Sequence, residues 1–250
     1  MKSISETGHA KNLATFNEMR SFVSTYGSDY NPAKASIGLA ELQTLSDDAG
    51  NALADLNERY SDWRNAKIAL DLALKPFSNL ITRIMNALRA SDTPVEADES
   101  ARMLIRKIRG KRVSAKLTDE EKQILAAEGK EAREISSSQT SFDNRMENFH
   151  RLIKLLSGFP LYAPNEPDLT VEGLSNLYDD LMRKNASAVA AYVSVSNARI
   201  ARNTVFYKSD TGLVDIALAV KAYVKSRFGT TSPQYKQIAK LRFRSQKAKL

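Results

Sequence analysis

The feature that most restricts the fold of this chain is a proline-free stretch of about forty residues with a recurring seventh position. Between residues 35 and 74 the seventh positions are Ala35, Leu42, Ala49, Leu56, Trp63 and Leu70. This period is typical of a helix that packs lengthwise against another helix, whereas a strand alternates at every second residue. We therefore predict a long helix over residues 35–74, with coiled-coil-like packing.

Further helices follow from proline, glycine and capping signals. Pro76 favours the start of a shorter helix that ends near residue 88, since proline is tolerated in a first helical turn. Thr118 and Glu121 form a capping-box pattern, which predicts a connecting helix over residues 118–157. Gly129 and the serines at 136–138 weaken its middle, so a break there is an alternative.

A second long helix is predicted over residues 170–207. Asp168 or Thr170 precedes it as a candidate N-cap, and Asp210 is a candidate N-cap for the helix that follows it.

The chain also contains matching segments about 132 residues apart. The pairs are 30–32 with 162–164, 38–42 (GLAEL) with 173–177 (GLSNL), 65–69 (NAKIA) with 197–201 (NARIA), and 105–111 with 238–244. Matches that keep their order and spacing indicate a duplicated unit. We therefore predict an all-α, elongated protein made of two related antiparallel helical bundles, residues 1–117 and residues 118–250.

The net charge of +8 is unevenly distributed. Residues 1–100 carry −4 and residues 117–215 carry −4, whereas residues 101–116 carry +7 and residues 216–250 carry +9. Each predicted unit is therefore an acidic body followed by a basic segment.

These basic segments hold the candidate contact residues. They are Arg106, Lys107, Arg109, Lys111 and Arg112 in the first, and Lys236, Lys240, Arg242 and Arg244 in the second. Three interpretations stay open: solvated cations that complement helix C-termini, contacts to an acidic protein or a second copy, and contacts to nucleic acid. Tyr223, Phe228, Tyr235 and Phe243 interleave with the second segment, where rings could stack on bases.

Signals for catalysis are scarce. Cysteine is absent, and there is no glycine-rich phosphate loop or serine-nucleophile motif. His9 lies in an N-terminal segment that we expect to be mobile, and Glu147 with His150 is a single Glu-x-x-His pair where a di-iron site needs two. Ser194, Ser196 and Trp63 are expected to pack inside the bundle.

Two matched polar residues allow two explanations. Asn65 and Asn197 either pair across the bundle to fix register or reflect common descent of the two units.

Residues 141–145, 196–203, 223–229 and 232–237 resemble a family of uncharacterised tandem helical-bundle proteins associated with Bacteroidota. The resemblance implies a bacterial, non-secreted, helical protein and no activity, cofactor or site residue.

From these observations we predict a non-enzymatic helical scaffold or interaction protein in the cytoplasm, without a cofactor, a membrane span or an evident small-molecule substrate. The partner is predicted to be an acidic protein surface or a second copy. The alternative is nucleic-acid binding through residues 101–116 and 216–250.

Overall fold

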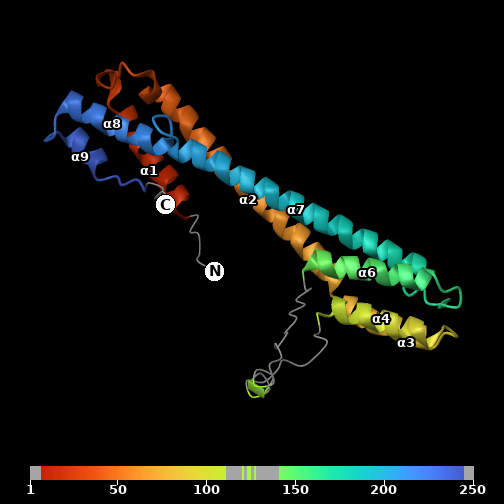
Figure 1. The fold of residues 1–250 in the computed structure, drawn as a ribbon. Coiled ribbons are helices and arrows are strands. Elements are labelled where there is room, and N and C mark those ends of the chain that lie inside the picture. Colours follow the sequence, from red (N-terminus) through yellow and green to blue (C-terminus); the bar gives the residue numbers. More distant parts are fainter. Residues whose placement is uncertain (1–6, 111–119, 121–122, 125–126, 128–140, 245–250) are drawn as a thin grey trace. The chain divides into compact units, whose positions relative to one another are not determined.

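The computed structural model describes residues 7–110, 120, 123–124, 127 and 141–244, and the regular elements in these ranges are all helices (Figure 1). The first part of the chain forms α1 (Thr7–Ser24), α2 (Leu39–Leu74), α3 (Phe77–Arg89) and α4 (Val95–Ile108). The second part forms α6 (Phe142–Ser157), α7 (Val171–Tyr207), α8 (Leu213–Phe228) and α9 (Pro233–Ala239). Two short 3₁₀ turns, Gly27–Asp29 and Ala35–Ile37, lie between α1 and α2. The predicted all-α class is confirmed.

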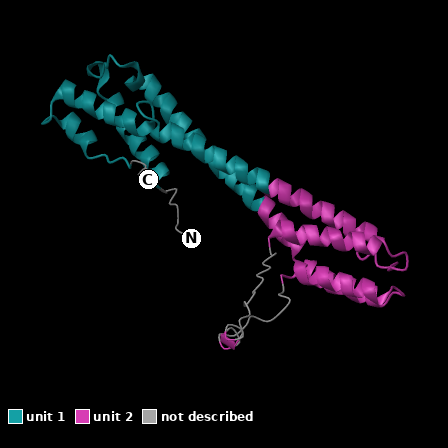
Figure 2. Ribbon diagram, in the orientation of Figure 1, with its two compact units in different colours: residues 1–65, 189–250 teal, residues 66–188 magenta. Residues whose placement is uncertain are grey.

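The described chain packs into two compact units (Figure 2). Unit 1 contains residues 1–65 and 189–250, and unit 2 contains residues 66–188. Helices α2 and α7 each contribute one part to unit 1 and the other part to unit 2. These units are defined by packing, whereas the predicted boundary at residue 117 is defined by sequence repetition and lies outside the described residues.

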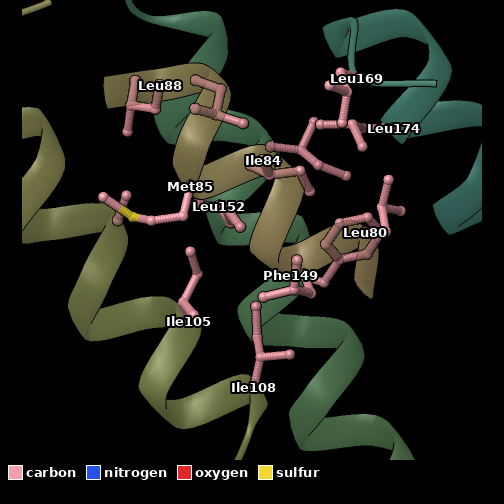
Figure 3. Close-up of a cluster of buried hydrophobic side chains, with 14 of the residues drawn as sticks. Leu80, Ile84, Met85, Leu88, Ile105, Ile108, Phe149, Leu152, Leu169 and Leu174 are labelled. Carbon is pink, nitrogen blue, oxygen red and sulfur yellow. The ribbon is translucent and has the colours of Figure 1, made fainter. Parts of the chain in front are cut away.

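The core of unit 2 is built from α3, α4, α6 and the adjoining parts of α2 and α7. Figure 3 shows members of this cluster from several helices, among them Ile84 of α3, Ile105 of α4 and Phe149 of α6. Half of the buried residues in this cluster come from the chain before residue 110, and the other half come from the chain after residue 140. Burial of each such side chain stabilises the fold by about 1.5–3 kcal/mol, so neither sequence segment can form this core alone.

The core of unit 1 combines α1 and the start of α2 with the end of α7, α8 and α9. Phe16, Met19 and Val23 of α1 are fully buried against a cluster that includes Phe206, Val220 and Ile238. Helix α1 thus lies in the same core as the last helices of the chain.

Both long helices were predicted nearly correctly. The predicted 35–74 helix begins at Leu39, because Ala35 belongs to a 3₁₀ turn and is exposed. The predicted 170–207 helix spans Val171–Tyr207, and the Thr170 hydroxyl accepts a hydrogen bond from the Gly173 N–H at 3.0 Å, as an N-cap does.

The buried positions of the long helices recur at every seventh residue. In α2 this series is Leu42, Ala49 and Leu56, and in α7 it is Leu174, Leu181, Ala188, Val195 and Arg202, while Ser46, Ala198 and Phe206 are buried outside it. The predicted positions Trp63 and Leu70 are half-buried.

The predicted 118–157 helix is interrupted before α6, as the alternative of a break allows. Helix α6 begins at Phe142, where Ser141 has an extended backbone and its hydroxyl accepts from the Asn144 N–H. The predicted start at residue 118 lies outside the described residues, and residues 120, 123, 124 and 127 are helical. One predicted N-cap was wrong. Asp210 does not cap α8: it has a left-handed φ of 63°, and the N-cap is Gly212. The predicted capping box at 118–121, Gly129 and the serine run lie at residues that are mostly outside the described ranges.

The entry into each long helix is held by the same hydrogen bond. The Tyr30 hydroxyl donates to the Ile37 carbonyl at 2.7 Å, and the Tyr162 hydroxyl donates to the Leu169 carbonyl at 2.9 Å. Both tyrosines are buried, and in both cases the acceptor is seven residues further along the chain. Tyr30 and Tyr162 are among the residues matched in the sequence.

Candidate interaction surfaces

Five exposed cations of unit 1 lie between the end of α8 and residue 244, and we call them the C-terminal basic surface. They are Lys225 of α8, Lys236 of α9, and Lys240, Arg242 and Arg244 in the segment after α9. Lys236 and Lys240 make no ion pair in the described part of the chain. The predicted residues of the second basic segment therefore lie on one compact unit and face solvent.

The segment after α9 is fixed in place by contacts with both α1 and α8. Asn12 of α1 donates its side-chain amide to the Arg244 carbonyl and accepts from the Arg244 N–H, both at 2.9 Å. Lys221 of α8 donates its ammonium to the carbonyl oxygens of Leu241 and Ala239. Because Ile238 and Leu241 are also buried, the backbone that carries these cations is held against the core of unit 1.

The titration of Lys221 reflects this environment. Its pKa is lowered, first by burial and second by the positive charge of Arg242. No acidic residue occurs between residues 216 and 250, and the carboxylate of Asp29, from the other end of the chain, pairs with Arg227 at 2.8 Å. The surface therefore carries an excess of positive charge that attracts anions.

The first basic segment is arranged differently. Arg106 and Lys107 are half-buried in the last turn of α4, where cations complement the helix dipole. Arg109 donates to the Thr82 hydroxyl at 2.7 Å. Lys111 and Arg112 lie outside the described residues. The described part of this segment belongs to unit 2 and fits the interpretation as a solvated helix end.

The aromatic residues that interleave with the second segment pack into unit 1. The Tyr223 hydroxyl accepts from the Asn31 N–H at 3.0 Å, and its ring meets the Tyr30 ring at 5.3 Å. The Phe228 ring meets the Tyr26 ring at 5.4 Å, and Tyr235 and Phe243 pack partly buried against the same core. All four rings are therefore partly buried against the core of unit 1.

Helix α7 carries an exposed face that the sequence analysis missed. No charged residue occurs between Lys184 and Arg199, and Val189, Tyr192, Val193 and Ile200 are 50–64% exposed. Ser194 and Ser196 are half-buried, as packing residues of this helix are expected to be. The fourteen residues between Lys184 and Arg199 contain no charge, which is unusual for a solvated helix face, and this signal could have indicated the exposed apolar face from the sequence.

Trp63 lies beside this face and is half-buried. Its ring meets those of Tyr60 and Tyr192 at 5.4 Å and 5.8 Å. Leu56, Val195 and Ala198 are buried in the same small cluster, so the position of Trp63 at the border of a core agrees with its predicted packing role.

The histidines have structural neighbours. His9 lies in α1, not in a mobile segment as expected, and its ring packs on Phe206 and Tyr207 at 5.5 Å each. The His150 ring packs on Tyr178 at 4.9 Å, while Glu147 pairs with Arg151 on the same helix. Among the described residues no group of three or more His, Asp or Glu side chains could hold a metal ion.

The matched asparagines do not pair in the bundle interior. Asn65 and Asn197 are both exposed, so they do not fix register as buried polar residues. Gln139, to which the same two explanations apply, lies outside the described residues.

None of the helices in the described ranges is long and apolar enough to cross a membrane. No family model, no curated protein and no solved structure matches the chain, so the resemblance to Bacteroidota helical proteins depends on the quoted residues alone.

Proposed function

We propose that this chain is a non-enzymatic interaction protein that binds an acidic partner protein through the C-terminal basic surface. The observation that carries the proposal is the anchored backbone of residues 240–244, which presents exposed cations with no acidic residue within the segment. A fixed backbone reduces the ordering entropy that binding costs, so such a surface can bind specifically and not only attract anions.

An acidic protein is favoured over a single-stranded nucleic acid. Single-strand binding combines cations with exposed aromatic rings on which bases stack. Here Tyr223 and Phe228 pack on Tyr30 and Tyr26, so the surface offers charge without a stacking platform. A second copy is one such partner, because Glu41, Asp47 and Asp48 are exposed on α2.

Binding of duplex nucleic acid through its phosphates is the second candidate, since phosphate contacts require cations alone. The same titration compares the two. Poly-L-glutamate and a mixed-sequence DNA duplex are titrated into the full chain at low and at physiological salt.

The test variant removes three cations of the surface: Lys236→Gln, Lys240→Gln and Arg242→Gln. The matched control removes three cations of α4: Arg106→Gln, Lys107→Gln and Arg109→Gln. We expect poly-L-glutamate to bind at low salt, with affinity reduced at least tenfold in the test variant and unchanged in the control. Tighter binding of the duplex with the same variant pattern would favour nucleic acid, and no binding of either probe at low salt would contradict both functions.

Light scattering over a concentration range tests self-association. A mass that rises with concentration at low salt and falls to that of a monomer at high salt supports a second copy as partner. A monomer under all conditions would exclude that form of the proposal.

We also propose that the two sequence halves are copies of one unit, with coiled-coil character in the long helices. Support comes from burial at matched positions. Buried pairs are Phe16 and Phe149, Met19 and Leu152, Val23 and Leu156, Leu42 and Leu174, Ala49 and Leu181, Ile105 and Ile238, and Ile108 and Leu241. At one place burial favours a different pairing from the sequence match: Leu39, which the sequence match pairs with Leu174, is 41% exposed, whereas Leu42 and Leu174 are both fully buried.

A further inference from the structure

Unit 2 contains a cavity of about 600 Å³, wide open to solvent, between α3 and the segment that connects α6 to α7. This volume lies in the range of ligand pockets in proteins. Residues that line it include Arg83, Ala87 and Asp92 on the side of α3, and Leu161, Ala163 and Glu166 on the side of the connecting segment. Two of them, Ala87 and Ala163, have small side chains, which leaves space between the two walls.

Unit 1 has the same two walls, as a comparison of α3 with α8 indicates. The buried residues of α3 and α8 follow one pattern, in which Phe77, Leu80, Ile81, Ile84 and Leu88 correspond to Leu213, Ile216, Ala217, Val220 and Val224. In this correspondence Ala87, which lines the cavity of unit 2, takes the position of Tyr223.

The opposite wall corresponds as well. Residues 161–169 of unit 2 match residues 29–37 of unit 1, because Tyr162 and Tyr30 each donate a hydrogen bond to the carbonyl seven residues ahead. Ala163 in the cavity wall therefore takes the position of Asn31.

In unit 1 the space between these walls holds the phenol ring of Tyr223. The ring stands at 88° to the ring of Tyr30 with centroids 5.3 Å apart, and its hydroxyl accepts a hydrogen bond from the Asn31 N–H at 3.0 Å. In unit 2 the methyl group of Ala87 stands in place of that ring. By this correspondence, the wall of the cavity at Ala87 lacks the ring that the matched wall of unit 1 carries.

We propose that the cavity of unit 2 binds a phenolic ring supplied by a ligand. The charges on its wall indicate what the ring is attached to. Glu166 and Asp92 line the cavity, while the guanidinium of Arg83 is held by Asp168 through two hydrogen bonds, one of them at 3.1 Å. The remaining negative charge favours a phenol next to a cationic group, either in a free phenolic amine or in a tyrosine flanked by basic residues of a peptide.

This inference rests on the duplication proposed above, from which the correspondence of α3 with α8 follows, and on the cavity. It does not depend on the C-terminal basic surface, so loss of poly-L-glutamate binding leaves it unaffected, and loss of tyramine binding leaves the interaction function unaffected.

The test is a titration of the full chain with tyramine, in which protein NMR spectra report binding at each step. The wild type is expected to bind one equivalent in the millimolar range, as a ligand of this size does. Ala87→Tyr places the missing ring in the cavity and is expected to abolish binding while the circular dichroism spectrum is unchanged. The control Ala186→Tyr adds a tyrosine at an exposed position of α7 outside the cavity and is expected to bind tyramine like the wild type.

Two further variants keep the test decisive if Ala87→Tyr does not fold. Tyr223→Ala removes the phenol of unit 1 and is expected to raise the stoichiometry from one tyramine to two. Glu166→Lys reverses one charge of the cavity wall, and is expected to weaken tyramine binding at least fivefold while the binding of neutral p-cresol stays the same.

Titration with the capped peptide Lys-Tyr-Lys distinguishes a peptide ligand from a small-molecule ligand, and the capped peptide Lys-Leu-Lys, which lacks the phenol, is the control. Tighter binding of the tyrosine peptide than of tyramine identifies a protein segment as the ligand, and weaker binding identifies a small molecule. Absence of binding by tyramine, p-cresol and the tyrosine peptide would overturn the proposal, as would undiminished tyramine binding by a folded Ala87→Tyr variant.

Discussion

Replacement of Tyr162 by phenylalanine tests the hydrogen bond that holds the entry into α7. The ring is buried, and its hydroxyl donates to the Leu169 carbonyl at 2.9 Å immediately before the helix begins. Phenylalanine keeps the ring and removes only this donor. The buried carbonyl then loses its partner, and because few water molecules can reach it, the desolvation cost is not recovered.

The expected loss of stability follows from that geometry. An unsatisfied buried acceptor costs about 1–3 kcal/mol, so the free energy of unfolding should fall by about that amount. For a chain of this size the melting temperature should fall by roughly 2–10 °C. Tyr30→Phe is expected to have the same effect at α2, because its hydroxyl donates to the Ile37 carbonyl at 2.7 Å.

The assay is urea unfolding of the two single variants, the double variant and the control Tyr192→Phe. Tyr192 is 52% exposed, so its variant should stay within about 0.5 kcal/mol of the wild type. Because Tyr30 and Tyr162 lie in different compact units, their effects should add. Single variants as stable as the control would refute the reasoning that these hydroxyls fix the helix entries.

Three further predictions concern pH, core packing and glycine. Burial raises the pKa of Tyr162 to about 12 from 10.0, so between these pH values the folded state keeps the phenol proton while the unfolded state loses it. The contribution of Tyr162 to stability is therefore fully present below pH 10 and falls as the pH rises to about 12. Urea unfolding across this window should show a smaller fall in the free energy of unfolding for the Tyr162→Phe variant. Phe149→Ala empties a fully buried site and should destabilise unit 2 by about 3–5 kcal/mol, measured by thermal unfolding. Gly173→Ala should destabilise the fold, because the new Cβ would lie 2.0 Å from the Pro167 carbonyl oxygen. Gly50→Ala lies in the interior of α2 with free space around the new Cβ, and should stabilise the fold by about 0.5–1 kcal/mol. Thermal unfolding of the two variants should therefore show melting temperatures that shift in opposite directions.

The long helices were predictable because their signals are local. A proline-free run with a period of seven leaves few alternatives to a helix, and the Thr170 cap depends on neighbouring residues alone. The interruption before α6 was less predictable, because the sequence suggested only that the middle of the 118–157 helix is weak, whereas the structure begins α6 at Phe142 with Ser141 as its N-cap.

The candidate sites were less accessible to sequence reasoning. The cations of residues 236–244 were found, because charge is visible in the sequence. The anchoring of Arg244 by Asn12 was not, since the two residues are separated by most of the chain. The cavity is lined by residues 83–92 on one side and residues 161–169 on the other, and no spacing along the chain indicates that these two segments will face each other.

The composition of unit 1 has a consequence for how the protein is made. Its core joins Phe16, Met19 and Val23 to residues of α8 and α9 that are synthesised roughly 200 residues later. At about 5–20 residues per second, the ribosome delivers those partners about 10–40 s after α1 has emerged. During that interval the apolar face of α1 is without its native neighbours. Unit 1 can therefore be completed only after α8 and α9 have been synthesised, and a premature stop anywhere before α8 leaves the buried side chains of α1 without their partners from these two helices.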